Sequence, residues 1–137
     1  MKYRSYRIAI AYFSLFSIAL VMSGLAMFIL KTGFSFNGVS EYYLGKSVEG
    51  LLELSHPHFG AMGLFIMVLG HFFVFTALRN RVSKGFLALF VLALLALGTP
   101  FLILKGFAWM SIVKIFSVTS FVLLSVYFSI KLLGHSR

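Results

Sequence analysis

Long apolar runs separated by short polar segments dominate the chain. Four of these runs, at about residues 8–30, 55–78, 85–104 and 108–133, are long enough to cross a bilayer, because a membrane-spanning helix needs about 20 mostly apolar residues. A segment inside lipid must satisfy its backbone hydrogen bonds internally, and the alternation typical of a membrane barrel is absent. The pattern therefore predicts an all-α fold, an antiparallel bundle of four membrane-spanning helices.

The composition agrees with this prediction and excludes a soluble domain. Of 137 residues, 61% are hydrophobic and 11% are charged. In a soluble domain, about a quarter of all residues are charged. The absence of cysteine excludes disulfides, thiolate metal sites and covalently attached c-type haem. No phosphate-binding glycine loop, metalloprotease motif or serine nucleophile elbow is present. We expect a single transmembrane domain over residues 1–137, and the sequence leaves open whether it is an enzyme.

The cations predict how the chain is oriented in the membrane. Twelve Lys and Arg residues against three acids give a net charge of +9. Eight cations fall on one side of the predicted bundle: Lys2, Arg4, Arg7, Arg79, Arg81, Lys84, Lys131 and Arg137. Cytoplasmic loops carry the excess of Lys and Arg, so we expect both termini in the cytoplasm and the protein in a bacterial inner membrane. The charge is thus a topology signal, and we expect the lipid bilayer but no nucleic acid as a partner.

The first run and the loop after it carry two further predictions. A basic start followed by an apolar run is typical of a signal peptide, but the run continues through residues 27–30, which favours a retained anchor. The outer loop, residues 31–54, holds all three acids of the chain. A short helix at the membrane surface is expected over residues 48–54, capping the outer end of the bundle.

Three histidines of the second run are the candidate ligands for a cofactor. Ser55 is the expected N-cap and Pro57 lies in the first turn, which places His56 and His58 at the outer membrane surface. His71 follows about 15 residues after His56, roughly 22 Å along the axis and only about 60° around it. An ionisable residue deep in a span is costly and indicates function. The alternative is a structural role, with each imidazole hydrogen-bonded or solvated.

Small residues separate the two nearly aligned histidines at intervals of three or four positions. They are Gly60, Gly63, Met67 and Gly70. Three glycines on one helix face leave a trough, which favours either close packing of another helix or room for a flat macrocycle with imidazole as axial ligand to haem iron. The second interpretation requires His56 and His71 to point inward, toward a cavity bordered by the glycines.

Two histidines on one helix with glycines between them, in a bundle of four spans, resemble the membrane b-type cytochromes. The resemblance covers the second run and implies haem b at two depths in the bilayer. Such bundles take matching histidines from a second helix, and the other three runs contain none. A homodimer, a partner membrane subunit, or a methionine such as Met27 or Met110 would have to complete each site. Residues 42–45 and the His-x-His pair are also similar to short, uncharacterised bacterial four-span proteins, which implies no activity.

Two residues stand out in the last two apolar runs. Pro100 can break the helix of the third run, and Lys114 is a charged residue inside the fourth. We expect Lys114 to extend its ammonium to the outer surface; alternatively, it pairs with a carboxylate or with the propionates of a bound haem, and so joins the candidate cofactor-binding residues. Pro100 is expected to loosen the end of the third run, with neighbouring groups satisfying the carbonyl that it frees.

Three functions follow from these observations. The first is a small inner-membrane redox subunit, binding haem b or contacting quinone, that passes electrons between the quinone pool and a periplasmic cytochrome or similar carrier. His56 or His58 would serve an outer site and His71 an inner one. The residues expected to shape a quinone or docking pocket are Tyr42, Tyr43, Glu49 and Glu53. The second is a non-catalytic structural or assembly subunit that docks through the glycines. The third is copper or zinc handling at the periplasmic face by His56, His58, Glu53 and nearby methionines. The candidate metal ligands of the whole chain, for haem iron or another metal, are His56, His58 and His71.

Overall fold

The computed structural model describes residues 4–76 and 79–135, and every regular element within these ranges is helical. The helices are α1 (Arg4–Thr32), α2 (Phe36–Leu44), α3 (Val48–Val74), α4 (Arg79–Leu104) and α5 (Met110–His135). Four of them, α1, α3, α4 and α5, are long and apolar enough to cross a membrane. The predicted all-α bundle with four membrane-spanning helices is confirmed. The predicted end of the second run at residue 78 lies outside the described residues.

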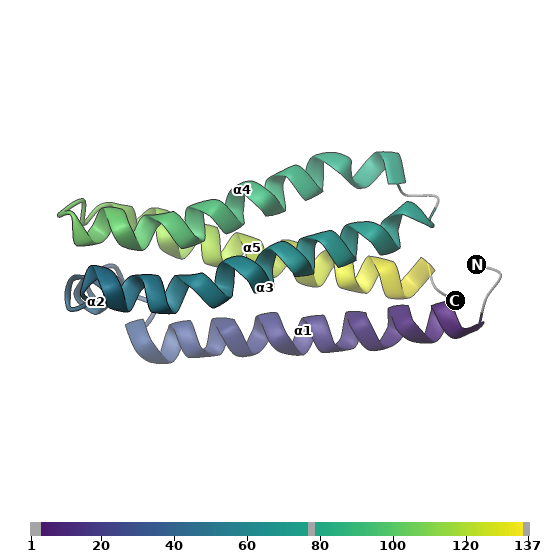
Figure 1. Ribbon diagram of the computed structural model, residues 1–137, viewed down its shortest axis with the longest axis horizontal. Helices are drawn as coiled ribbons and strands as arrows, with labels where there is room; N and C mark the ends of the chain where they lie inside the picture. The colour runs from purple at the N-terminus through teal and green to yellow at the C-terminus, as the bar shows by residue number, and fades with distance from the viewer. Residues whose placement is uncertain (1–3, 77–78, 136–137) are drawn as a thin grey trace.

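The four long helices run side by side, and α2 lies across one end of the bundle (Figure 1). α5 packs against α1 and α4, and α3 packs against α4. The start of α1 and the end of α5 lie at the same end, opposite α2 (Figure 1). This end carries the cations that predict the cytoplasmic side, of which Lys2 and Arg137 lie outside the described residues. We call the α2 end the outer end.

The start of α3 differs from the prediction. α3 begins at Val48, because Ser47 is its N-cap and accepts a hydrogen bond from the Gly50 N–H at 3.0 Å. Ser55 is therefore not a cap, and Pro57 lies well inside the helix. The short surface helix expected over residues 48–54 is instead the first part of α3. A separate surface helix exists earlier in the chain, as α2.

Two clusters of side chains form the interior of the bundle. The larger one lies along α1, α3, α4 and α5 and includes the buried residues Leu69, Leu89 and Leu132. The smaller one, which we call the outer cluster, joins α2 to the outer ends of the long helices. Its buried members are Val39, Tyr43, Leu51 and Ile103. The outer cluster is what holds α2 across the end of the bundle.

Hydroxyl side chains also lie inside the bundle, on both α1 and α5. The buried serines of these two helices are Ser14, Ser17, Ser111, Ser117, Ser125 and Ser129. Because serine is small, it lets two helix backbones approach closely within a membrane. Small buried side chains of this kind suit the close packing of α1, the first helix, against α5, the last one.

Candidate functional site

The histidines of α3 point away from the bundle. His56, His58 and His71 are all exposed, and the prediction that His56 and His71 face an interior cavity is wrong. The buried residues of α3 are Leu51, Ser55, Phe65, Leu69 and Phe73. They recur at helical spacing and turn toward α4 and α5, which leaves the three histidines on the outer surface. His58 stays close to its own helix, with Nδ1 2.7 Å from the Leu54 carbonyl oxygen.

The glycine trough is open to the outside of the bundle over most of its length. A Cβ atom placed on Gly60 or Gly63 would have no described neighbour within 4 Å. Met67 is 63% exposed. At Gly70, by contrast, the Phe86 ring of α4 comes within 3.8 Å of the Cβ position. We call the surface formed by Gly60, Gly63, Met67 and His71 the outward face of α3.

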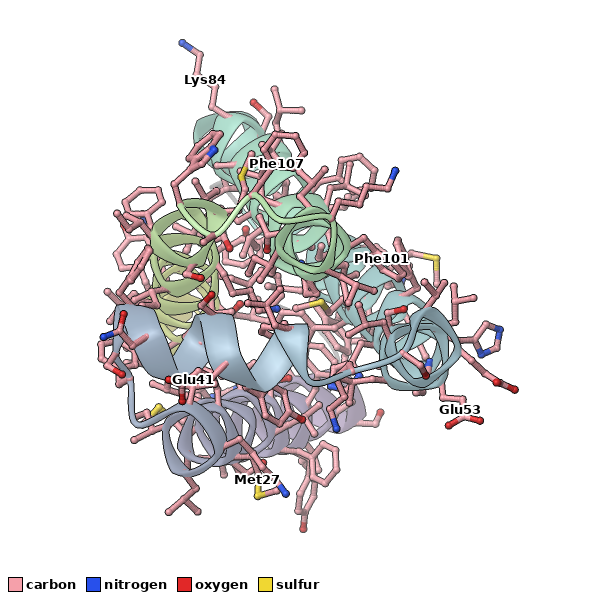
Figure 2. The ribbon with its side chains drawn as sticks, turned by 90° about the vertical axis from the view of Figure 1, so that its left-hand side faces the viewer. Met27, Glu41, Glu53, Lys84, Phe101 and Phe107 are labelled. Atoms are coloured by element: carbon pink, nitrogen blue, oxygen red, sulfur yellow. The ribbon has the colours of Figure 1, made fainter. Side chains whose placement is uncertain are left out.

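These positions do not fit a haem held by two axial ligands within one chain. Met27 points away from the bundle (Figure 2) and is 54% exposed. Met110 packs into the outer cluster instead. Neither methionine is placed to oppose a histidine on the outer surface of α3. Among the described residues, no group of three His, Cys, Asp or Glu side chains could hold a metal ion.

A groove lies at the outer end of the bundle, between α3 and α4. Its volume is about 660 Å³, and it is open to the surroundings. The lining residues are Leu52, Glu53, Ser55, His56, Phe59 and Phe101. Seen from the outer end, Glu53 and Phe101 lie on the same side of the bundle (Figure 2). This groove brings one of the candidate histidines together with one of the candidate acids.

The polar groups of the groove can exchange protons, while most of its wall is apolar. Glu53 and His56 are one turn apart on α3, and both are exposed. The Ser55 hydroxyl already donates to the Leu51 carbonyl at 2.7 Å. Pro57 lacks the N–H that would bind the Glu53 carbonyl, so this oxygen has no donor in the helix ladder. A mostly apolar groove with a few polar groups is typical of a small-molecule site.

Three of the four residues expected to shape a quinone pocket lie elsewhere. Tyr43 is buried in the outer cluster, and burial raises the pKa of its phenol. The Tyr42 ring lies 4.8 Å from the Nζ atom of Lys46. Glu49 is exposed in the first turn of α3. Of these four residues, Glu53 alone lines the groove.

The aromatic walls of the groove were not predicted from the sequence. Phe59 follows His56 by three positions, so its proximity could have been inferred from helical spacing. Phe101 comes from α4, and its place beside His56 depends on how far α4 is shifted along α3. Since apolar residues occur on both the buried and the exposed sides of α3 and α4, the sequence contains no signal for that shift.

Lys114 is buried in the outer half of the bundle. Its side chain is 8% exposed, so the prediction that it extends to the outer surface is wrong. The ammonium donates a hydrogen bond to the Ala96 carbonyl of α4. The Nζ atom also lies 5.3 Å from the centre of the Tyr43 ring and 6.0 Å from that of Phe28. The described neighbours of this cation are therefore a carbonyl and two aromatic rings.

Comparison with known proteins places the chain among membrane domains. A protein family described as a transmembrane helical domain matches residues 33–135, which include α2, α3, α4 and α5. No curated protein and no solved structure matches the chain significantly. The family description names membrane helices, and these comparisons show no resemblance to the b-type cytochromes.

Proposed function

The chain belongs to the Aq_1264_TM family of transmembrane helical domains, and we propose that it is a quinone-contacting subunit of a membrane redox complex. The observation that carries this proposal is the groove between α3 and α4. There, Glu53 and His56 lie beside the rings of Phe59 and Phe101 at one end of the membrane-spanning bundle.

The residues that line the groove suit the chemistry of a quinone headgroup. A quinone is a flat ring with two carbonyl oxygens and a long apolar tail. The rings of Phe59 and Phe101 offer apolar surface to the headgroup, and the His56 imidazole can hydrogen-bond a carbonyl oxygen. The groove volume of about 660 Å³ lies within the range of about 300–1,000 Å³ that is usual for ligand sites. Because the groove is open, the tail can extend into the surrounding lipid.

The same residues can accept the protons of a quinol. Oxidation of a quinol to a quinone releases two electrons and two protons. A neutral imidazole at His56 can take one proton from a quinol hydroxyl. Glu53, one turn away and exposed, can pass protons on to the aqueous phase. The two electrons leave through a redox partner, which we propose to be a membrane subunit or a periplasmic carrier.

Binding of a short-tailed quinone to the purified protein tests this function. We expect titration calorimetry in detergent to detect binding of a short-tailed naphthoquinone or benzoquinone. The substitution His56→Ala should weaken the affinity for quinone about tenfold. This is the effect of losing one hydrogen bond worth about 1.4 kcal/mol. The matched control is His58→Ala, which removes an exposed histidine from the same turn of α3 but outside the groove.

The outcome with the control variant decides the interpretation. His58→Ala should bind the quinone as the unmodified protein does. No binding to the unmodified protein, or equal affinities of all three proteins, would contradict a quinone site at His56.

The outward face of α3 favours a second function, that of an assembly subunit. An imidazole that faces acyl chains is costly, and His71 lies on an exposed face within a membrane-spanning helix. Gly60 and Gly63 leave the backbone open to close approach by another helix. We propose that a second copy of this chain covers this face. A two-fold axis along the bilayer normal places each residue of α3 near its own copy at the same depth.

This assembly could also provide the second axial histidine that haem b would need. In such a dimer, His71 of each chain would lie at the same depth as its copy, so a second chain can supply the ligand that one chain lacks. A reduced-minus-oxidised spectrum of the purified protein tests for haem b directly. Absence of haem bands after expression with sufficient haem would contradict haem binding and leave the quinone site unaffected.

A further inference from the structure

Lys114 and Pro100 form a pair whose role is separate from the groove. Pro100 lies inside α4 and has no N–H, so it cannot bind the Ala96 carbonyl one turn earlier. The ammonium of Lys114, from α5, donates to this same carbonyl. We propose that Lys114 is a latch: it supplies the hydrogen bond that Pro100 removes, and it thereby fixes α2 across the outer end of the bundle.

The first part of the latch joins α4 to α5. Ala96 is 2% exposed, and an unpaired backbone carbonyl buried away from water is as unfavourable as a lost hydrogen bond. Hydroxyl groups three positions from Ala96 and from Lys114 do not take this role. In the described part of the chain, the buried hydroxyl groups of Thr99 and Ser111 have no hydrogen-bond partner. The long side chain of Lys114 reaches the carbonyl where these short ones do not.

The second part of the latch joins both helices to α2. The Nζ atom of Lys114 lies 5.3 Å from the centre of the Tyr43 ring, within the range of a cation–π interaction. Tyr43 is 4% exposed and is one of three residues that α2 buries. A short helix with so few buried residues depends strongly on each contact. Loss of the ammonium therefore weakens the attachment of α2 as well as the pairing of α4 with α5.

A double-mutant cycle tests whether Lys114 and Pro100 act together. Lys114→Met leaves the Ala96 carbonyl unpaired, and we expect the unfolding temperature to fall by about 5 °C. In Pro100→Ala, the new N–H can bind the same carbonyl. Adding Lys114→Met to this variant should therefore lower the unfolding temperature by less than half as much as in the unmodified protein. The matched control is Lys46→Met, which removes an exposed lysine that also lies over a tyrosine ring. We expect no coupling between Lys46 and Pro100.

Labelling of a single cysteine tests the attachment of α2. The natural chain has no cysteine, so Ser40→Cys introduces one thiol at a position of α2 that is 8% exposed. In the Lys114→Met background, a membrane-impermeant maleimide should label this thiol about tenfold faster, because α2 detaches more often. In the Lys46→Met background the rate should stay unchanged.

Two results would overturn the latch. One is strict additivity of Lys114→Met and Pro100→Ala in the unfolding temperature. The other is an unchanged labelling rate of Ser40→Cys when Lys114 is replaced. If Lys114→Met alone yields no folded protein, the proposal requires that the double variant with Pro100→Ala does fold. If neither variant folds, the proposal is contradicted. None of these measurements depends on quinone binding.

Discussion

Gly85 shows how closely single residues are packed between α4 and α5. A Cβ atom at this position would lie 2.3 Å from the Cζ atom of Phe128. The Phe128 ring cannot easily move, because it is stacked on Phe86 at 5.1 Å and meets Phe73 edge-on at 5.6 Å between ring centres. The glycine is therefore required by space and not by backbone conformation.

Replacing this glycine should destabilise the bundle. We expect Gly85→Ala to lower the free energy of unfolding by about 1–3 kcal/mol, the usual cost of overpacking, although alanine favours a helix. Gly98→Ala is the matched control within α4, since no described atom lies within 4 Å of its Cβ position. There, alanine should be neutral or stabilise by about 0.5–1 kcal/mol. Chemical unfolding in detergent measures both, and equal effects would refute the overpacking.

The direction of individual side chains is what the sequence could not provide. The positions of His56 and His71 along α3 could be predicted from the length of the apolar run. Which way they point could not, because apolar residues occur on both sides of the helix: Phe65 is 8% exposed and Leu64 is 58% exposed. In a membrane, the face toward lipid is as apolar as the face toward the core. The periodicity that identifies the buried face of a soluble helix is therefore missing.

At the scale of elements, the capping residues determine where α2 and α3 begin. Ser35 and Ser47 each accept a hydrogen bond from the backbone N–H three positions later. Capping serines were therefore present in the sequence as signals for both helices. Ser55 and Pro57 also resemble the start of a helix, so the prediction that α3 begins there is too late in the chain. The proline is tolerated inside α3 because it removes a single hydrogen bond of a 27-residue helix, at an exposed position.

Tyr43 makes the attachment of α2 sensitive to alkaline pH. Burial raises the pKa of its phenol above the ordinary value of 10.0, so the folded state holds the neutral form while a detached α2 can ionise. The contribution of Tyr43 to stability is therefore fully present below pH 10 and is lost as the pH rises above it. We expect thermal unfolding to show a steeper loss of stability above pH 10 in the unmodified protein than in Tyr43→Phe.

The comparison with a second tyrosine isolates this effect. Tyr12 is 73% exposed on α1, and Tyr12→Phe should keep the pH dependence of the unmodified protein. Lysine titration is common to all three proteins and cancels in the comparison. Identical curves for Tyr43→Phe and the unmodified protein would show that α2 is not held through this phenol.

At the scale of the whole molecule, connections and packing follow different rules. Short connections predict that the second, third and fourth spans are neighbours in order, and α3, α4 and α5 do pack in that order. The contact of α1 with α5 is not set by a short connection. Both helices carry buried serines, and the sequence does not specify which neighbouring helix each serine faces. The groove likewise arises only when α3 and α4 are placed side by side.

The outward face of α3 makes a prediction about the assembled molecule. If a second copy covers this face, Gly60→Leu and Gly63→Leu should each shift the protein from dimer to monomer, because a large side chain separates the backbones. Gly24→Leu is the matched control, on α1, where no described atom lies within 4 Å of the Cβ position. Light scattering of the protein in detergent gives the mass. A monomeric unmodified protein, or a dimer unaffected by both leucines, would exclude this interface.

The groove at Glu53 and His56 is the centre of the functional account, and photolabelling tests it most directly. The purified protein in lipid nanodiscs would be illuminated with an azido-quinone, digested and mapped by mass spectrometry. We predict label within residues 52–59 or at Phe101, displaced by an excess of unlabelled quinone. Label spread over the lipid-facing surfaces of all four long helices, and unaffected by that excess, would contradict the quinone site.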